Sequence, residues 1–484
     1  MGKTEKAMGD HSREFQFFPR VINPVRIKSA VLFAADQRVR ITLKVLEENM
    51  PWLSARVLSD PVSVSNYRAD QATAFIFDDT AINFVDTELI RQNNKDAVIA
   101  LLTSNDFVQC SPPAIAAQKF PYSSKADLVF ACNSSDCASG NIIVSVVRAS
   151  EDLLNITRYS KARRYIFLLV DDEPRWFSQF LPVLYHIIGQ RADVMLARTF
   201  EQALTFLFGV ESEFQIDDEM FKSRGHGDDV VCLITDIFFP MGDELNSTAG
   251  KDLIRLTRKY YPHIPIIIAS KTKEAEAFKD ESIYLLPKGD PGSLETLRKH
   301  IRDNTGIGKF IILNKHGKEL FRIKNISEMM AVLTMAEAES PKAAELRRIL
   351  ESHGSKDYFS TWLYMHSFRE LAGELMPKRA SGRRLVTLLK KYLGREMLRI
   401  ACTPLVIEGR KAFDLQGLVA LLKSVDPANV QEFSDNDIFS SWLDRKGYSE
   451  LADELRPIHA RGAKLMEMLA DSIERWVREN NVEE

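Results

Sequence analysis

Ten short apolar runs, arranged in two sets of five, are the feature that most limits how this chain can fold. Each run is four to seven residues long and is followed by a longer stretch with room for a helix. Continuous apolar runs of this length are typical of parallel strands that are buried on both faces. We therefore predict two doubly wound α/β domains, each built on a five-stranded parallel sheet. The runs occupy residues 30–35, 55–59, 74–77, 97–102 and 127–132, and then residues 165–170, 193–198, 230–235, 264–270 and 283–287.

The last part of the chain contains an internal duplication. Residues 357–385 align without gaps with residues 437–465, at a constant offset of 80 positions. The shared residues are mostly apolar or capping types, which favours a packing role, and we expect Trp362 and Trp442 to be core anchors. This region should be a mainly helical α+β region made of two related units. Pairs identical in the two copies include Phe359/Phe439, Ser360/Ser440, Trp362/Trp442, Leu371/Leu451, Leu375/Leu455, Pro377/Pro457 and Gly382/Gly462.

These patterns divide the 484 residues into several domains, as expected at roughly 150 residues per domain. We predict a polar tail (1–20), a first α/β domain (21–158), a second α/β domain (159–305), and repeat units at 306–393 and 394–484.

Charge and hydropathy limit the partners of the chain. Lys and Arg number 64 and Asp and Glu number 67, a net charge of −3, so no overall positive field attracts nucleic acid or an anionic membrane. The N-terminus lacks an apolar signal region, and no run of about 18 apolar residues occurs. We therefore expect a cytoplasmic protein with no membrane span.

Three carboxylates follow strands of the second set. Asp171 and Asp172 come directly after the run 165–170, and Asp236 comes directly after the run 230–235. In a parallel sheet the carboxyl ends of neighbouring strands share one edge, so these side chains should converge there. Three crowded acids raise one another's pKa unless a cation compensates them. Mg²⁺ is the expected ion, because it binds carboxylates and shares its remaining positions with phosphate.

Two further polar residues complete this edge. Ser270 ends the fourth run, and Lys288 follows the fifth and offers an ammonium to phosphate oxygens. The set predicts a phosphoryl-transfer site, with Asp236 as the nucleophile that forms an acyl phosphate.

Residues 164–303 resemble the receiver domain of two-component response regulators. The acid pair, the DIFFP segment beginning at Asp236, the hydroxyl residue and the lysine follow the order of that family. The resemblance implies a flavodoxin-like fold, with Asp236 as phosphoacceptor, Mg²⁺ on Asp172 and Asp236 with support from Asp171, and Ser270 and Lys288 as switch residues. Two positions depart from the family: Leu285 stands where an aromatic residue is usual, and Gly289 stands where proline is usual.

The first α/β block resembles a receiver that has lost this chemistry, a pseudo-receiver. Asp36 alone follows its first run, Asp78 and Asp79 follow its third, and Cys132 and Asn133 follow its fifth in place of a lysine. We expect it to serve for contact, and Asp78 as a second phosphoacceptor is the less favoured alternative. The whole arrangement also resembles the N-terminal regulatory region of bacterial phosphoenolpyruvate-synthase-like proteins, without the catalytic part.

The resemblance implies a response regulator acting in phosphorelay signal transduction. Its partners would be a histidine kinase or phosphotransfer protein and a downstream protein, with self-association as a further option, and no enzyme activity is expected beyond self-phosphorylation and autodephosphorylation. Two alternatives stay open. One is a constitutive scaffold with a little-used receiver site. The other is a phosphotransfer protein using His353, His366 or His459, although we expect these to be ordinary surface histidines.

Overall fold

The computed structural model divides the chain into two compact units, Pro19–His300 and a C-terminal unit that begins at Ile301. The first unit holds the two predicted sheets and the second holds the duplication. Within the described residues, none of the helices has the length and apolarity needed to cross a bilayer. The structure describes residues 25–34, 46, 49–50, 52–103, 125–132, 141–158, 165–189, 191–216, 225–242, 244–271, 283–314, 319–355, 357–376, 378, 380–458 and 460–480.

The first sheet has five parallel strands in the order β2-β1-β3-β4-β5. All of β3 and β4 is buried, as expected for central strands covered on both faces. Helix α3 (Pro61–Ser65), the 3₁₀ helix η1 (Ala81–Phe84) and α4 (Thr87–Asn93) connect its strands. The strands are β1 (Ser29–Phe33), β2 (Ser54–Val57), β3 (Thr73–Asp78), β4 (Ala97–Thr103) and β5 (Leu128–Ala131).

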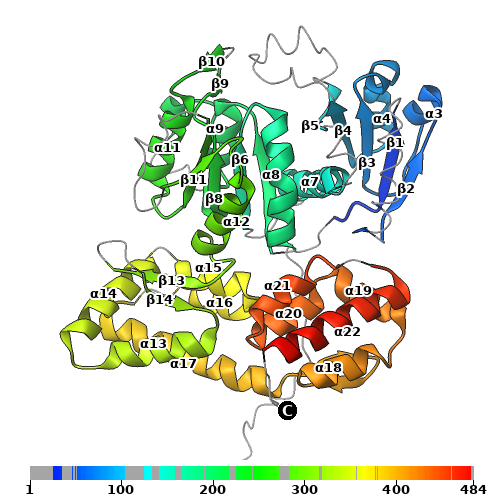
Figure 1. The fold of residues 1–484 in the computed structure, drawn as a ribbon. Helices are drawn as coiled ribbons and strands as arrows, with labels where there is room; N and C mark the ends of the chain where they lie inside the picture. The colour runs from blue at the N-terminus through cyan, green and yellow to red at the C-terminus, as the bar shows by residue number, and fades with distance from the viewer. Residues whose placement is uncertain are drawn as a thin grey trace, which may run out of the picture. The chain divides into compact units, whose positions relative to one another are not determined.

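The second sheet is also all parallel and has the order β12-β11-β8-β6-β7 (Figure 1). Counted along the chain, both sheets therefore share the strand order 2-1-3-4-5. The prediction of two five-stranded parallel sheets is confirmed. The strands are β6 (Ile166–Val170), β7 (Asp193–Ala197), β8 (Val230–Thr235), β11 (Ile266–Ser270) and β12 (Ile283–Pro287).

Local sequence signals explain the helices around the second sheet. Helix α8 (Pro174–Ile188) begins on a proline, which the first turn tolerates because its N–H would have no partner there. Before α9 (Phe200–Phe208), Thr199 Oγ1 accepts from the Gln202 N–H at 3.3 Å, and Gln202 Oε1 accepts from the Arg198 N–H at 2.8 Å. This reciprocal capping box fixes where α9 starts. Helices α11 (Ala249–Tyr260) and α12 (Ser293–Asn304) complete the layers.

Helix α7 (Asn141–Thr157) joins the two sheets (Figure 1). It contacts β4 and β5 of the first sheet and β7 and α8 of the second. Its Asp152 is fully buried, and Oδ2 of this residue accepts from the Tyr185 hydroxyl at 3.1 Å and the Val194 N–H at 2.9 Å. A second link runs from the Ala131 N–H to Ser178 Oγ at 3.0 Å. The two sheets therefore share a buried, hydrogen-bonded helix.

The C-terminal unit contains two copies of one motif, a short antiparallel hairpin followed by five helices. The first copy is β13 (Phe310–Leu313), β14 (Glu319–Ile323), α13 (Ile326–Glu337), α14 (Pro341–Ser355), α15 (Tyr358–Met365), α16 (Arg369–Leu375) and α17 (Gly382–Cys402). The second is β15 (Leu405–Ile407), β16 (Arg410–Ala412), α18 (Leu415–Leu422), α19 (Pro427–Asp435), α20 (Ile438–Arg445), α21 (Ser449–Leu455) and α22 (Gly462–Glu479). Helix α17 runs across residue 393, where the sequence placed the end of the first copy.

Each copy is centred on its tryptophan. Trp362 and Trp442 are each 1% exposed, which confirms the prediction that they are core anchors. Their indole N–H groups donate to the Gly308 carbonyl at 3.1 Å and the Thr403 carbonyl at 3.5 Å, respectively. Each carbonyl lies two residues before the first hairpin strand of its copy. One side chain thus fixes both the helical core and the start of the hairpin.

Replacing either anchor by phenylalanine should destabilise the C-terminal unit by about 2 kcal/mol, because the change removes ring volume from a buried core and removes the indole hydrogen bond. Urea denaturation of the full chain, followed by far-ultraviolet circular dichroism, measures both. Trp476→Phe, at a partly buried ring, is the control, and equal midpoints for all three variants would contradict the anchor role.

Candidate functional site

The three strand ends predicted to meet do meet. Asp171, Asp236 and Lys288 directly follow β6, β8 and β12. Backbone hydrogen bonds hold these ends in register. The Asp171 N–H donates to the Ala197 carbonyl at 3.0 Å, and the Asp236 N–H donates to the Val170 carbonyl at 3.0 Å. The carboxyl edge of the second sheet therefore positions all three side chains before any side-chain contact is made.

The Lys288 ammonium bridges two carboxylates at this edge. Its Nζ lies 2.6 Å from Asp171 Oδ2 and also donates to Asp236 Oδ2. The side chains of Lys288 and Asp171 are each 1% exposed, whereas that of Asp236 is 13% exposed. Asp236 is therefore the member of this trio that a molecule in solution can reach.

Electrostatics in this trio follow from burial and mutual charge. Burial favours the neutral forms, but the two carboxylates outweigh it for the lysine and raise the pKa of Lys288 above its usual value. Burial raises the pKa of Asp171, against the opposing effect of Lys288 and with the added effect of the Asp236 charge. Lys288 is therefore held as a cation, while the carboxylates are short of positive charge.

Asp172 adds a further carboxylate to the same edge. Burial, together with the charges of Asp171 and Glu173, raises its pKa to about 7. The Arg198 guanidinium, directly after β7, is near enough for the Asp172 charge to oppose the fall in the Arg198 pKa that burial causes. An acid with a pKa this high lacks full compensation, and a divalent cation bound by carboxylates would supply it.

Ser270 and Gly289 lie beside Lys288. Ser270 ends β11, and its carbonyl accepts from the Lys288 N–H at 3.1 Å. Gly289 has φ +83°, a conformation closed to proline, whose ring holds φ near −65°. This explains why glycine stands where the receiver pattern has proline. At the other departure, Leu285, the neighbouring Tyr284 ring packs on His300 at 5.2 Å.

Sequence reasoning missed several residues around this edge. A hairpin of β9 (Phe239–Met241) and β10 (Glu244–Asn246) follows Asp236. A Cβ at Gly250, at the start of α11, would lie 2.4 Å from the Asp236 carbonyl oxygen, so only glycine lets the helix pack so closely. The pattern reasoning also gave no role to Glu173, Trp176 or Lys271, which border the Lys288 side.

At the corresponding edge of the first sheet, the acids serve local structure. Asp78 is buried, and its Oδ1 accepts from the Thr80 N–H at 3.1 Å and the Ala81 N–H at 2.7 Å. Asp79 Oδ2 accepts from the Thr103 hydroxyl at 2.9 Å. Cys132 lies directly after β5, while Asp36 and Asn133 are outside the described residues.

The histidines of the repeats are held by hydrogen bonds. His366 is buried, which corrects the expectation of a surface residue. Its Nδ1 lies 2.8 Å from Asp444 Oδ1, and its Nε2 lies 2.8 Å from the Gly308 carbonyl. His353 Nδ1 lies 2.9 Å from the Ile349 carbonyl. These contacts occupy the nitrogens that a phosphotransfer histidine would use, and His459 is outside the described residues.

The described part of the chain offers no ready-made metal site. None of its clusters of three or more His, Cys, Asp or Glu side chains is arranged to hold an ion. In the acidic site, Lys288 lies between two of the carboxylates that the Mg²⁺ prediction requires. The carboxylate oxygens are donors of the type that Mg²⁺ prefers, and the raised pKa of Asp172 indicates a shortage of positive charge there. Mg²⁺ stays a prediction for this site.

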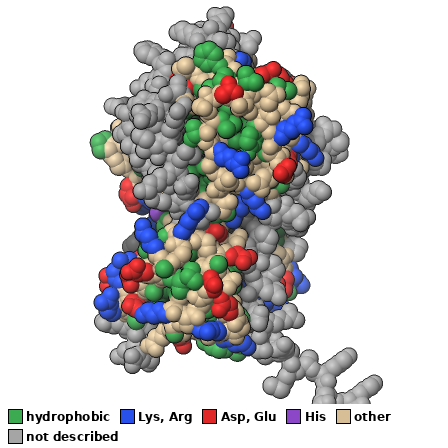
Figure 2. All heavy atoms as spheres, turned by 90° about the vertical axis from the view of Figure 1, so that its right-hand side faces the viewer, with side chains coloured by type: hydrophobic (Ala, Val, Ile, Leu, Met, Phe, Trp, Pro, Cys, Tyr) green, Lys and Arg blue, Asp and Glu red, His purple; other side chains and the backbone are tan. Residues whose placement is uncertain are grey.

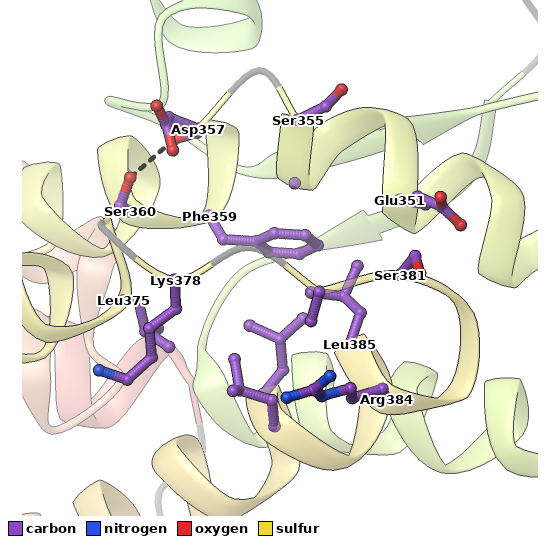
Figure 3. A pocket seen from close by; sticks show the side chains of 14 residues that line it. Glu351, Ser355, Asp357, Phe359, Ser360, Leu375, Lys378, Ser381, Arg384 and Leu385 are labelled. Atoms are coloured by element: carbon purple, nitrogen blue, oxygen red, sulfur yellow. Dashed lines mark hydrogen bonds between the residues drawn. The ribbon is translucent and has the colours of Figure 1, made fainter.

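A separate cavity of about 400 Å³ opens in the first repeat (Figure 3). Its floor is apolar, from Phe359, Leu375, Leu385, Leu388 and Leu389, and charged side chains of both signs line its rim. In the second repeat, Ser434 and Ile458 replace Gly354 and Lys378, and the Ser434 hydroxyl donates to the Ile458 carbonyl at 2.9 Å. Gly354 and Lys378 both line the cavity in the first copy.

Comparisons with known proteins give little further information. No protein-family model and no curated protein matches the chain. A crystal structure of a protein assigned as a two-component system response regulator/GGDEF domain protein is similar at 14% identity, covering 56% of this chain and 97% of that chain with a TM-score of 0.26. The C-terminal domain of glucosamine-fructose-6-phosphate aminotransferase from Francisella tularensis aligns at 9% identity, covering 57% and 81%, with a TM-score of 0.17. At these scores both are weak structural neighbours, and neither supports an argument.

The raised pKa of Asp172 predicts a pH-dependent stability. Between the ordinary pKa of 3.8 and about 7, the folded protein binds this proton more tightly than the unfolded chain, so stability falls as pH rises through this range. Asp172→Asn should therefore raise stability at pH 8 without divalent ions by about 1 kcal/mol, and much less at pH 4. Thermal unfolding at both pH values measures the difference. The control is Asp290→Asn on the exposed loop after Lys288, and a pH-independent effect of Asp172→Asn would contradict the prediction.

Placing the side chains of the second copy at the matching positions of the cavity should stabilise the first repeat. A Cβ at Gly354 would meet Leu385 at 3.4 Å, an ordinary contact, so Gly354→Ser fits. Combined with Lys378→Ile, it should add about 1 kcal/mol through helix propensity and apolar burial. Urea denaturation measures the gain. Ser434→Gly with Ile458→Lys in the second repeat should destabilise by a similar amount, and a loss of stability in the first pair would refute this account of the cavity.

Proposed function

We propose that this chain is a response-regulator-type signalling protein in which phosphorylation of Asp236 changes a protein-interaction surface. The observation that carries the proposal is the Lys288 ammonium bridging Asp171 and Asp236 at the carboxyl edge of a parallel sheet. The strand order 2-1-3-4-5 supports a flavodoxin-like receiver domain, in which ligands bind at this edge where the order reverses. The first sheet acts as a pseudo-receiver, because Asp78 is engaged in capping.

In this proposal Asp236 is the nucleophile. A carboxylate oxygen of Asp236 attacks the phosphorus of a phosphodonor, and the new oxygen–phosphorus bond forms as the donor leaves with the electron pair of its own bond to phosphorus. Lys288 is held as a cation and stabilises negative charge on the transferring group. Asp171 stays paired to Lys288 and orients it, while Ser270 offers its hydroxyl to the new phosphoryl oxygens.

Mg²⁺ is proposed for the same edge on the chemistry of its carboxylate donors. Asp172 and Asp236 would bind it and Asp171 would support it. A bound Mg²⁺ neutralises charge on the phosphoryl oxygens. The unmet need for positive charge around Asp172 supports this assignment, and carboxylate oxygens are the donors that Mg²⁺ prefers.

The output would be protein binding. A phosphoryl group adds about 1.5 to 2 negative charges. Its oxygens would compete with the two carboxylates for the Lys288 ammonium, and the strand ends that carry Lys288 and Ser270 would change position. Partners would be a histidine kinase or phosphotransfer protein in the cytoplasm, a downstream protein, and a second copy of this chain. Figure 2 shows one face of the molecule, on whose described residues basic side chains are interspersed with acidic ones, which does not favour nucleic acid.

The alternative is a constitutive scaffold. The observation that favours it is the same ion-paired trio, because a buried lysine between two carboxylates is also a stable structural element. In this alternative Asp236 remains unmodified, and the shared helix α7 and the repeats provide fixed binding surfaces.

Incubation with acetyl phosphate and Mg²⁺ separates these functions. The intact mass should rise by one phosphoryl group in the wild type and not in Asp236→Asn, and a chelator should abolish the gain. The matched control is Asp78→Asn, at the equivalent strand end of the first sheet, which should leave the gain unchanged because an asparagine oxygen can still cap η1. Absence of an adduct with several donors would favour the scaffold, and an adduct that persists in Asp236→Asn would exclude Asp236 as the acceptor.

A further inference from the structure

Trp176, in the first turn of α8, covers the lysine side of the acidic site. Its side chain is largely buried. The centroid of the indole lies 5.6 Å from Lys288 Nζ, 4.9 Å from Lys271 Nζ and 4.5 Å from the Arg175 guanidinium carbon. An indole face attracts cations, and the attraction grows when both groups are shielded from water.

One hydrogen bond fixes the indole in this place, and the backbone of Gly289 lies beside the ring. Its Nε1–H donates to Glu173 Oε2 at 2.6 Å, and this carboxylate also accepts from Arg175 Nε at 3.0 Å. On the opposite side, a Cβ at Gly289 would lie 3.4 Å from the indole Cη2. The ring thus extends from the loop after β6 to the loop after β12, the two loops that carry Asp171 and Lys288.

We propose that Trp176 is a positioning residue that holds Lys288 in place and keeps water away from the lysine side of the site, and so lengthens the lifetime of the phosphorylated state. This inference rests on the proposed function, because it concerns the same phosphorylated aspartate. The exposure of the trio supports it: the side chains of Lys288, which faces the ring, and of its partner Asp171 are each 1% exposed, while that of Asp236 is 13% exposed. The donor therefore has an open approach to Asp236, and the lysine side is closed.

The consequence concerns hydrolysis. The acyl phosphate is lost when a water oxygen attacks phosphorus, the bond from phosphorus to the Asp236 oxygen breaks, and phosphate and a free carboxylate are released. The indole keeps water from the Lys288 ammonium that would hold the phosphoryl oxygens. Shielded from water in this way, the ammonium attracts phosphoryl oxygens more strongly. Loss of the ring should therefore speed hydrolysis more than it slows phosphorylation.

The first test compares the lifetime of the adduct. After phosphorylation with acetyl phosphate and removal of the donor, Trp176→Leu should lose the phosphoryl group about tenfold faster than the wild type. Trp176→Phe, which keeps an aromatic face, should lie between them. The control is Trp52→Leu in the first sheet, where Arg26 lies 4.4 Å from the Trp52 ring centroid. This variant loses a similar cation–aromatic contact and should keep the wild-type lifetime.

The second test needs no phosphorylation. Reductive methylation mapped by mass spectrometry should label Lys288 slowly in the wild type and about tenfold faster in Trp176→Leu, while exposed Lys299 labels equally in both. Circular dichroism verifies the fold of each variant, and Trp176→Phe serves if Trp176→Leu does not fold. If the wild type takes up no phosphoryl group, the proposed function is wrong. The labelling test alone then decides whether Trp176 shields Lys288. If the wild type and Trp176→Leu show equal labelling of Lys288, or equal lifetimes of the adduct, the proposed role of Trp176 is wrong.

Discussion

The pairing of one ammonium group with two carboxylates controls the chemistry available at the edge of the second sheet. Lys288 reaches both Asp171 and Asp236 because three parallel strands end side by side, and their backbone hydrogen bonds continue past the last strand residue. Charges buried in this way are tolerated only when paired. One positive charge meets two negative ones, and Asp172 adds a further carboxylate. The edge therefore keeps an excess of negative charge. This imbalance makes the site receptive to a divalent cation and suits a switch, because a new anion must compete for Lys288.

Much of the fold could be predicted from the sequence because its signal is local. Buried parallel strands are short continuous apolar runs, so the strands of both sheets could be predicted from the position and length of these runs. An acid or lysine directly after a strand must lie at the carboxyl edge of the sheet. The β9–β10 hairpin was not predicted, because its strands are only three residues long. The burial of His366 was not predicted, because its partners, Asp444 and Gly308, are far away in sequence. Trp176 fitted a helical apolar spacing, and that pattern says nothing about which cations its ring faces.

The two repeats show how one duplicated motif diverges without losing its core. Both copies keep the tryptophan, its hydrogen bond to the start of the hairpin, and an aspartate with φ +57° directly before the following helix, Asp357 and Asp437. What changed is peripheral. Gly354 and Lys378 line a cavity in the first copy, and Ser434 and Ile458, joined by a hydrogen bond, stand at the matching positions of the second. Residues that contribute to both the hairpin and the helical core are constrained twice, while rim residues are free to vary.

The buried helix α7 has a consequence for how the protein can be divided. Asp152 satisfies a hydroxyl and a backbone amide of the second sheet from a helix that precedes that sheet in the chain. A fragment starting at residue 159 would lack this carboxylate, so the Tyr185 hydroxyl and the Val194 amide would lose their acceptor, and the apolar side of α8 would be left bare. The smallest self-sufficient piece carrying the acidic site therefore has to begin upstream of α7, and the first sheet is part of its foundation rather than a detachable neighbour.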